Sequence, residues 1–371
     1  MYIEKIKLFN FRNYIEQEIK FDKNINIFYG NNAQGKTNII EAIYSCAIGK
    51  SYRTNRDKEV INISKKFSTV EVNYSKKDRE GKVKLEISNK KIISINDIKA
   101  KKMSDVLGNI NIVLFTPDDI NIFKEGPAKR RRVLDVMISQ LRPAYVYNFN
   151  MYLKVLEQRN NYLKQIKYEN KKEELLGIWE EKMAEYAEII YNYRKQFVEK
   201  IKEKIVEIHK KITDNKEIIK LEYISDFKTK EEYIKELEKN RKIDIIKGFT
   251  GKGIHRDDLK LYINDKEIGI FGSQGQHRSA ILSIKLTELE IIKEEIEEKP
   301  ILLLDDFMSE LDKERRENFL EDVKDTQIII TCTDKLDLKN ENKKIFFVEN
   351  RKCKRLKILY KKLDFWLKSI I

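Results

Sequence analysis

Cysteine, histidine and proline are scarce in this chain of 371 residues, which has three cysteines, three histidines and four prolines. The cysteines are scattered and form no CxxC pair: Cys46, Cys332 and Cys353. This spacing argues against a disulfide framework or a zinc site and is typical of a reducing compartment. The histidines are equally dispersed, so the sequence gives no sign of a metal cluster built on imidazole.

Long apolar runs are also missing. No stretch approaches the roughly 18 consecutive apolar residues that a membrane span needs. The opening residues, from Met1 to Lys7, lack the apolar block of a signal peptide. We therefore expect a soluble, cytoplasmic protein without a membrane partner.

Charged residues, by contrast, are abundant: they make up 37% of the chain, hydrophobic residues make up 41%, and the net charge is +14. A chain of this composition and length is globular, with room for two domains or one bilobal domain. The positive charge favours a polyanionic partner, nucleic acid first and an anionic membrane surface second. Compositional bias explains the spread of lysines nearly as well, because no single patch dominates.

Two kinds of secondary-structure pattern alternate along the chain. Apolar or alternating runs predict strands at 25–29, 69–74, 83–87, 92–95, 112–115, 301–304 and 328–330, and a hairpin at 259–270. Helical patterns are expected at 37–48, 276–297 and 313–324, and the stretch from 127 to about 246 has a helical period throughout. We predict an α/β fold with one discontinuous domain, residues 1–120 and 248–371, that carries a helical second lobe, residues 121–247.

A phosphate-binding loop is the clearest motif. Residues 30–37 fit G-x-x-x-x-G-K-[ST] and lie between a predicted strand and a predicted helix. In that setting the loop amides form an anion nest and the helix N-terminus adds positive dipole. Lys36 would reach the outer phosphates of ATP, and Thr37 can ligate Mg²⁺. An ordinary glycine-containing turn is the weaker explanation, because the strand–loop–helix context is satisfied.

Two carboxylates follow the apolar run at 301–304. A buried parallel strand delivers the residues at its carboxyl end to the crevice where α/β proteins bind ligands. Asp305 would then hold Mg²⁺, and Asp306 would orient or deprotonate the attacking water. A solvated acidic pair after a core strand is the commoner explanation of such a sequence taken alone, but the phosphate loop makes the catalytic one preferable.

Two further segments precede helices. Ser273, Gln274, Gly275 and Gln276 offer a second anion-binding helix start, which could close over ATP held by another copy of the chain. Without the phosphate loop, a capped glycine loop would be the simpler interpretation. The run from Ser309 to Asp312 also suits an ordinary first helical turn.

Together these segments resemble the ABC-type ATPase heads of the SMC and RecF group. Residues 30–37 resemble Walker A, 301–306 Walker B, 273–276 the signature motif and 309–312 the D-loop. A finer resemblance is to the RecF family, and it extends over nearly the whole chain. It is carried by Asn10-Phe11-Arg12-Asn13-Tyr14, Gly35-Lys36-Thr37-Asn38, Glu41-Ala42-Ile43, Ser51-Tyr52-Arg53-Thr54, Phe115-Thr116-Pro117-Asp118-Asp119, Gly126-Pro127 with Arg130-Arg131-Arg132, Gln158-Arg159-Asn160, His255-Arg256-Asp257-Asp258-Leu259, and Ser273-Gln274-Gly275-Gln276 with Arg278.

The resemblance implies a mixed sheet with a phosphate loop, ATP-dependent homodimerisation, slow ATP hydrolysis and binding to duplex, gapped or single-stranded DNA. It also implies work with RecO and RecR to place RecA on gaps. The nucleotide-binding residues it implies are Gly30, Asn31, Asn32, Ala33, Gln34, Gly35, Lys36, Thr37, Asn38, Arg12 and the 273–276 segment. Lys36, Asp305 and Asp306 would be catalytic, Thr37 and Asp305 would hold Mg²⁺, and residues 331–333 would lie near the γ-phosphate.

Two residues depart from the wider ABC pattern. Ala33 stands where other heads commonly have glycine, which stiffens the loop. Asp306 stands where most transport ATPases have glutamate, and its shorter side chain predicts slower activation of water.

For DNA contacts the sequence offers only candidates. Residues 129–132, Lys-Arg-Arg-Arg, form the densest basic run and suit phosphates. A solvated helix start or a salt-bridged seam explains the run equally well. No base-reading motif is present, so we expect DNA binding that ignores base sequence.

Three other functions fit the sequence less well. An SMC-like structural ATPase would need long heptad arms, which the helical lobe lacks. A transporter subunit would carry a different signature motif and order of motifs. An ATP-gated DNA clamp with negligible hydrolysis is disfavoured by the intact set of Lys36, Thr37, Asp305 and Asp306.

Overall fold

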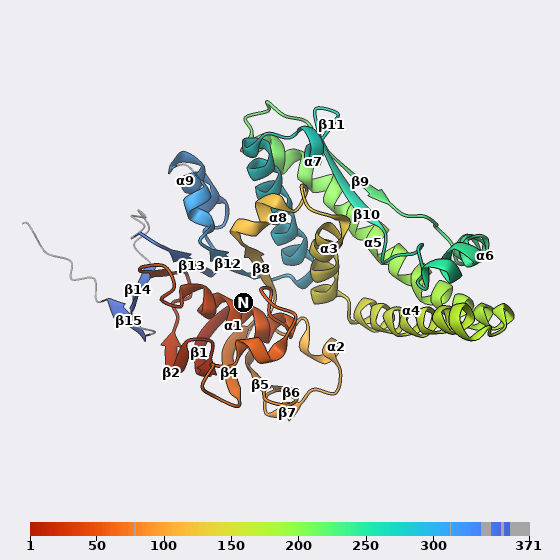
Figure 1. The fold of residues 1–371 in the computed structure, drawn as a ribbon. Coiled ribbons are helices and arrows are strands. Elements are labelled where there is room, and N and C mark those ends of the chain that lie inside the picture. The colour runs from red at the N-terminus through yellow and green to blue at the C-terminus, as the bar shows by residue number, and fades with distance from the viewer. Residues whose placement is uncertain (78, 312, 335–342, 350–351, 357–371) are drawn as a thin grey trace, which may run out of the picture.

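The computed structural model describes residues 1–371 except 78, 312, 335–342, 350–351 and 357–371 (Figure 1). The described strands form three sheets. No helix among the described residues combines the length and the apolar character needed to cross a bilayer.

The central sheet joins strands from distant parts of the chain in the order β15-β14-β3-β13-β12-β8. Neighbouring strands run parallel except at the β14–β15 edge. Its strands are β3 (Ile25–Tyr29), β8 (Ile112–Phe115), β12 (Ile301–Asp305), β13 (Ile328–Cys332), β14 (Lys343–Glu349) and β15 (Lys352–Leu356). The four strands predicted here are confirmed, because each is a short apolar run bounded by polar residues.

An antiparallel sheet of order β2-β1-β4-β5-β6-β7 lies beside it. The strands are β1 (Tyr2–Phe11), β2 (Tyr14–Lys20), β4 (Ser68–Lys76), β5 (Arg79–Ile87), β6 (Lys91–Ile95) and β7 (Ile98–Lys99). The predicted strands at 69–74, 83–87 and 92–95 are confirmed. Buried and partly exposed residues alternate along β4, as expected for a sheet with one face on the core.

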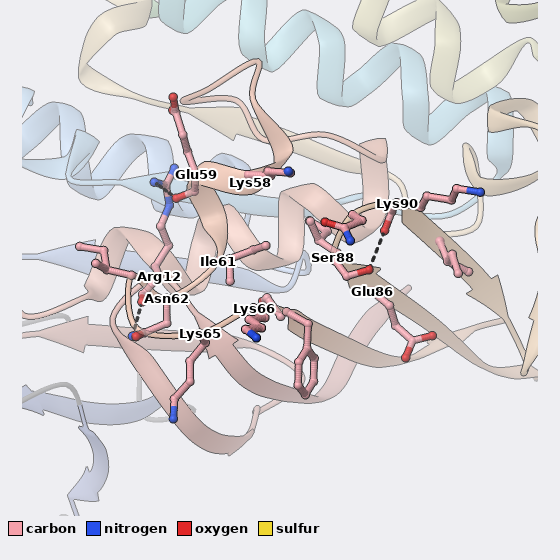
Figure 2. Close-up of a pocket in the computed structure, with 16 residues that line it drawn as sticks. Arg12, Lys58, Glu59, Ile61, Asn62, Lys65, Lys66, Glu86, Ser88 and Lys90 are labelled. Atoms are coloured by element: carbon pink, nitrogen blue, oxygen red, sulfur yellow. Dashed lines mark hydrogen bonds between the residues drawn. The ribbon is translucent and has the colours of Figure 1, made fainter.

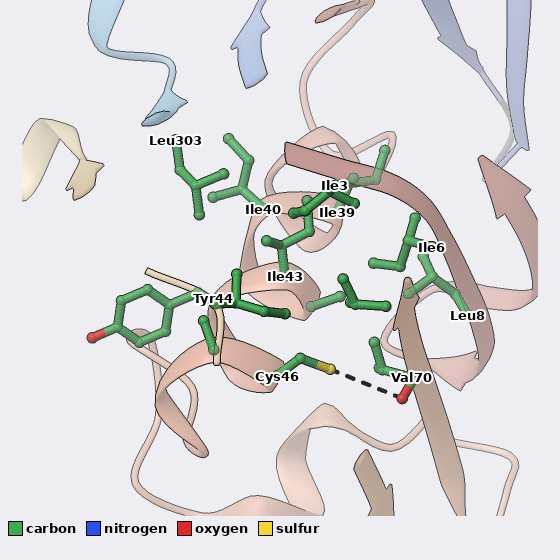
Figure 3. Close-up of a cluster of buried hydrophobic side chains, with 14 of the residues drawn as sticks. Ile3, Ile6, Leu8, Ile39, Ile40, Ile43, Tyr44, Cys46, Val70 and Leu303 are labelled. Carbon is green, nitrogen blue, oxygen red and sulfur yellow. Dashed lines mark hydrogen bonds between the residues drawn. The ribbon is translucent and has the colours of Figure 1, made fainter. Parts of the chain in front are cut away.

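Helix α1 (Lys36–Ile48) lies between these two sheets. Eleven of its thirteen residues are buried. Figure 3 shows its isoleucines packed against β1, β4 and Leu303 of β12. Gly49 ends the helix in the left-handed conformation. A helix held on both sides in this way fixes the direction of the loop that precedes it.

Helix α8 (Gln274–Ile296) packs on the opposite face of the central sheet. Side chains of β12 alternate between the two faces: Leu303 belongs to the cluster with α1, and Leu302 and Leu304 belong to the cluster with α8. The helix begins two residues before its predicted start. Helix α9 (Lys313–Asp322) follows β12 and ends two residues before its predicted end.

The helical lobe is built on two long helices that lie side by side (Figure 1). Its helices are α3 (Pro127–Leu141), α4 (Pro143–Glu169), α5 (Leu176–Ile212) and α6 (Lys230–Lys247). The short helix α2 (Met103–Val106) lies outside this lobe and packs in the cluster with α1 and the antiparallel sheet. At 1.5 Å per residue, the 37 residues of α5 extend about 55 Å. The sequence predicts an apolar face on this helix from Met183 to Ile212. Its members up to Ile205 are buried in the core of the lobe, whereas Ile208 and Ile212 are partly buried against the cluster of the central sheet.

A third sheet corrects the prediction of helix throughout residues 127–246. Strand β9 (Ile219–Ile224) lies in that stretch and pairs with β10 (Asp258–Ile263), which pairs with β11 (Lys266–Glu267). The turn at Asn264 and Asp265 has positive φ angles of 50° and 60°, as a tight hairpin requires. The predicted hairpin is confirmed, but its second strand ends at Glu267 and not at 270, because Ile268–Phe271 form the short helix α7.

The sheet of β9, β10 and β11 contacts α5, so residues 258–267 pack with the helical lobe. The division into residues 1–120 with 248–371 and residues 121–247 stays a prediction.

Candidate active site

The loop between β3 and α1 adopts the backbone that a phosphate-binding loop requires. Gly30 and Gly35 have φ angles of 147° and 112°, which side chains rarely permit. A Cβ on Gly30 would lie 2.4 Å from the carbonyl oxygen of Val348, so β14 leaves no room for one. Ala33 adopts a φ of 63°. A left-handed alanine costs about 1 kcal/mol, which a glycine at this position would not.

The ammonium group of Lys36 folds back over this loop. Its Nζ donates to the carbonyl oxygens of Gly30 at 2.6 Å and Asn31 at 2.9 Å. Burial lowers the pKa of Lys36, and the nearby carboxylates of Asp306 and Asp305 oppose that shift. The lysine is therefore held by neutral carbonyl groups. A phosphate bound in the loop would form a stronger, charge-assisted hydrogen bond with the same ammonium group.

Asp305, the last residue of β12, connects this strand to the phosphate-binding loop. The hydroxyl of Thr37 donates to its Oδ1 at 2.8 Å, and Thr331 at the end of β13 donates to the same oxygen at 2.8 Å. Tyr52 donates to Oδ2 at 2.7 Å. Only 5% of Asp305 is exposed. Parallel strands β12 and β13 end at the same edge as β3, which is why residues 268 positions apart meet here.

Asp306 lies at the point where β12 turns into the next segment. Its φ is 52°, a left-handed conformation that aspartate tolerates better than most residues. Its backbone N–H donates to the carbonyl and hydroxyl oxygens of Thr331 at 3.1 and 3.0 Å. These hydrogen bonds between the ends of β12 and β13 fix the backbone of Asp306 and so the position from which its side chain extends.

Arg12 is held by an acidic side chain of the phosphate-loop helix. Its guanidinium donates to both carboxylate oxygens of the buried Glu41, at 2.6 and 2.9 Å. Arg53 donates to the same carboxylate at 3.2 Å and to the side chain of Asn38 at 3.0 Å. Asn38 in turn donates to Asn13 at 2.7 Å. The structure places Arg12 beside the nucleotide loop, in an ion pair, and its predicted approach to ATP stays a prediction.

The 273–276 segment begins α8. The hydroxyl of Ser273 accepts from the N–H of Gln276 at 3.2 Å, and the Gln276 side chain accepts from the N–H of Ser273 at 3.0 Å. This reciprocal cap explains the early start of the helix. The first-turn amides of Gln274 and Gly275 have no acceptor within the helix, and both residues are exposed. Ser273 is exposed as well, so this segment faces outward from the chain.

Two other predicted segments lie at the same edge. Ser309 follows Asp306 and donates to its carbonyl oxygen at 2.6 Å. Asp312, the last residue of the predicted D-loop, lies outside the described residues. Thr331 is buried at the end of β13 and contacts Asp305, as described above, whereas Thr333 is only partly buried.

The basic run at 129–132 forms ion pairs within the protein. Lys129 pairs with Glu125 at 2.6 Å, and Arg130 makes a two-point contact with Asp258 at 2.7 and 2.9 Å. Arg131 donates to the carbonyl oxygen of Asp257 at 2.6 Å. The salt-bridged seam, one of the two structural alternatives, describes Arg130, whereas Arg131 contacts a backbone carbonyl.

Sequence reasoning gave no role to three residues that organise this site: Asn13, Glu41 and Tyr52. Asn13 donates to the carbonyl of Gln34 at 3.0 Å and so holds the phosphate loop from the side. Each of the three lies within a segment that carries the RecF resemblance. That pattern was the available signal, but only the folded structure shows what each side chain contacts.

A family model described as an AAA domain matches residues 5–242. The chain is 45% identical over 355 residues to the DNA replication and repair protein RecF of Acetivibrio thermocellus, covering 92% of this chain and 96% of that one. It is 45% identical over 365 residues to the RecF protein of Clostridium kluyveri, covering 96% and 100%. The chain belongs to the RecF family.

Solved structures agree with this assignment. An ATP-bound RecF described as a recombination mediator of the RecFOR pathway is 36% identical, with a TM-score of 0.91 over 96% of this chain and 98% of that one. An SMC head from Pyrococcus furiosus matches with a TM-score of 0.55 at 19% identity, which shows the fold alone. This RecF family member is thus an ABC-type ATPase of DNA replication and repair, and the predicted α/β ATPase fold is confirmed.

Proposed function

We propose that this protein binds ATP and Mg²⁺, dimerises on DNA when ATP is bound, and hydrolyses ATP slowly. The observation that carries the proposal is the hydrogen bond from Thr37 to Asp305, since it joins the phosphate loop to the carboxyl end of β12. RecF relatives and the RecFOR pathway of the solved neighbour support a role with RecO and RecR in loading RecA at gaps.

The residues at this edge suit Mg²⁺. The Thr37 hydroxyl and the Asp305 carboxylate are hard oxygen ligands 2.8 Å apart, and Mg²⁺ is usually held by one or two such groups together with substrate phosphates. When bound, the ion would neutralise charge on the transferred phosphoryl group. Thr331 and Tyr52 donate to Asp305 and so keep its oxygens turned toward Thr37.

The remaining roles are divided among the chain's own groups. Lys36 would exchange its carbonyl contacts for phosphate oxygens, and the loop amides would hold the rest of the triphosphate. Asp306 would orient the attacking water, and its short side chain fits slow turnover. The exposed 273–276 segment would close over the γ-phosphate of ATP bound by a second subunit. The backbone N–H groups of Gln274 and Gly275, at the N-terminus of α8, face outward and could donate to that phosphate.

Mixing two variants tests the shared site. Ser273→Arg should bind ATP normally but lose ATP-dependent dimerisation and hydrolysis, whereas Asp306→Asn should bind ATP and accumulate as a dimer. A heterodimer of the two has one site with both defects and one intact site, so mixing should restore part of the ATPase activity. Thr229→Arg, at the cap of α6, is the matched control and should behave as wild type.

Two outcomes would contradict the proposal. Loss of ATP binding by monomeric Ser273→Arg would place the segment in its own subunit's pocket. Dimers of the wild type that form on ATP without any turnover would favour the ATP-gated clamp.

A further inference from the structure

A groove of about 1040 Å³ lies beside the antiparallel sheet (Figure 2). One wall is the segment at 58–68, which leads into β4, and the other is the β5–β6 turn at 86–92. Arg12 is the one residue of the predicted nucleotide site that lines it. Figure 2 shows Arg12 and Glu59 on one side of the groove and Ser88 and Lys90 on the other.

Four lysines around this groove have no acidic partner within the described part of the chain: Lys58, Lys65, Lys66 and Lys90. All four are exposed. The carboxylates of the groove are already engaged by cations that do not line it. Glu59 pairs with Arg56 at 3.7 Å, and Glu86 pairs with Lys84 at 2.9 Å. The groove therefore presents uncompensated positive charge.

An aromatic surface lies at the same place. Phe67 lines the groove and is 48% exposed, and its ring is 5.6 Å from that of Phe9, which is 40% exposed. Exposed phenylalanine rings next to free lysines are the pairing that single-stranded nucleic acid uses: bases stack on rings while cations follow the backbone. An acidic peptide would use the lysines but would leave the rings without a partner.

We propose that this groove binds single-stranded nucleic acid, with phosphates on the four lysines and a base on Phe67. The inference deepens the proposed function and rests on it. A duplex fits the observations less well, because its bases are stacked inside and cannot reach a ring on the protein surface. Lysines carry point charge without a fixed fork of donors, so binding would not depend on base sequence.

The groove is also joined to the nucleotide loop through the turn between β1 and β2. The backbone N–H of Arg12 donates to the carbonyl oxygen of Val60, and its Nη1 donates to the carbonyl oxygen of Glu59, both at 2.7 Å. The carbonyl oxygen of Arg12 accepts from the side-chain amide of Asn62 at 2.7 Å. The next residue, Asn13, holds the phosphate loop at Gln34. Binding that orders the 58–67 segment would therefore change ATP affinity, and ATP would change strand affinity by the same factor.

The test compares two fourfold variants of the full chain. Lys58→Gln, Lys65→Gln, Lys66→Gln and Lys90→Gln form the groove variant. Lys235→Gln, Lys239→Gln, Lys242→Gln and Lys247→Gln form a control of equal charge on α6, where these exposed lysines form no salt bridge among the described residues. The probes are a fluorescent 15-nucleotide oligothymidylate, a duplex of that length and a polyglutamate peptide.

The groove variant should bind oligothymidylate at least tenfold more weakly, and the control within about twofold of wild type. A plot of the logarithm of the groove variant's oligothymidylate affinity against the logarithm of salt concentration should be less steep by about 3. Each single-strand phosphate contact contributes about 0.7 to this slope, and the variant loses four lysines. Phe67→Ala should weaken single-strand binding about five- to hundredfold and leave the duplex unaffected, and Phe67→Tyr should bind as wild type does.

Equal oligothymidylate affinities of the groove variant and the control would overturn the site. A loss for duplex or polyglutamate as large as for oligothymidylate would overturn the single-strand assignment. ATP affinities that are identical with and without oligothymidylate would overturn the link to the phosphate loop. If the wild type hydrolyses ATP but binds no DNA at all, the proposed function itself fails.

Discussion

The nucleotide edge and the helical lobe both gather charged side chains, but Lys36 and Asp305 at that edge are held differently from the buried charges of the lobe. In the lobe, Arg159 is fully buried and donates to Asp244 at 2.8 Å and Glu180 at 2.9 Å. At the nucleotide edge, Lys36 donates to carbonyls, and Asp305 accepts from hydroxyls. Cations paired directly with carboxylates hold helices together. Charges held by neutral groups can exchange those groups for a charged ligand.

The largest expected effect comes from breaking the lobe's ion cluster. Arg159→Met should lower the free energy of unfolding by about 3 kcal/mol, because it leaves buried carboxylates without their cation. Arg241 still pairs with Glu180, and the Gly251 amide still donates to Asp244, which limits the loss. Urea unfolding measures the change.

Adding Glu180→Gln and Asp244→Asn to Arg159→Met should recover part of that stability. Arg56→Met, which removes an exposed arginine, should change it by about 0.5 kcal/mol or less. An Arg159→Met variant as stable as wild type would mean that the cluster is not structural.

Lys36→Ala should show the opposite balance. ATP affinity should fall about a hundredfold, since a charge-assisted contact contributes roughly 1.5–3 kcal/mol. The free energy of unfolding should stay within about 0.5 kcal/mol of wild type or rise, because burial already lowers the pKa of this lysine and so disfavours its charged form. Fluorescent nucleotide titration and thermal unfolding give the two numbers. Unchanged ATP affinity would remove the phosphate-loop assignment.

His255 makes the lobe sensitive to acid. Burial lowers its pKa to about 4, and its ring lies 2.7 Å from the Tyr152 hydroxyl and 3.1 Å from the Thr250 carbonyl. Below a pH of about 6.5 the imidazole of His255 is protonated in the unfolded chain but stays neutral in the folded one. The free energy of unfolding therefore falls as the pH drops toward 4. Wild type should lose up to about 3 kcal/mol over this window relative to His255→Gln. Parallel pH profiles would contradict the assignment.

Tyr52→Phe should have the smallest effect. It removes one hydrogen bond to Asp305 and keeps the edge-on contact of the ring with Tyr44, whose centroid is 5.2 Å away. We expect hydrolysis to slow about fivefold, corresponding to about 1 kcal/mol, with little change in ATP affinity. Steady-state kcat and KM separate the two. A large loss of stability would show that this tyrosine acts mainly in packing.

The sequence predicts the elements of this molecule better than the contacts between its side chains. The loop at 30–37 and its flanking strand and helix follow from local pattern alone, as do β12 and β13. Strand β9 was missed, although its residues alternate between apolar and polar, because it lies between two stretches of helical pattern. The contact of Arg12 with Glu41 was out of reach, since sequence shows which residues are charged and not which charges meet.

The position of β3 has a consequence for how the protein is made. Its two neighbours in the sheet, β13 and β14, lie about 300 residues further along the chain. On the ribosome, the strand that carries the phosphate loop therefore emerges long before either partner exists. Such distant pairing is slow to form and leaves apolar strand edges exposed meanwhile. The nucleotide pocket should therefore mature late in the nascent chain, and ATP binding should mark the point at which β13 and β14 have been made.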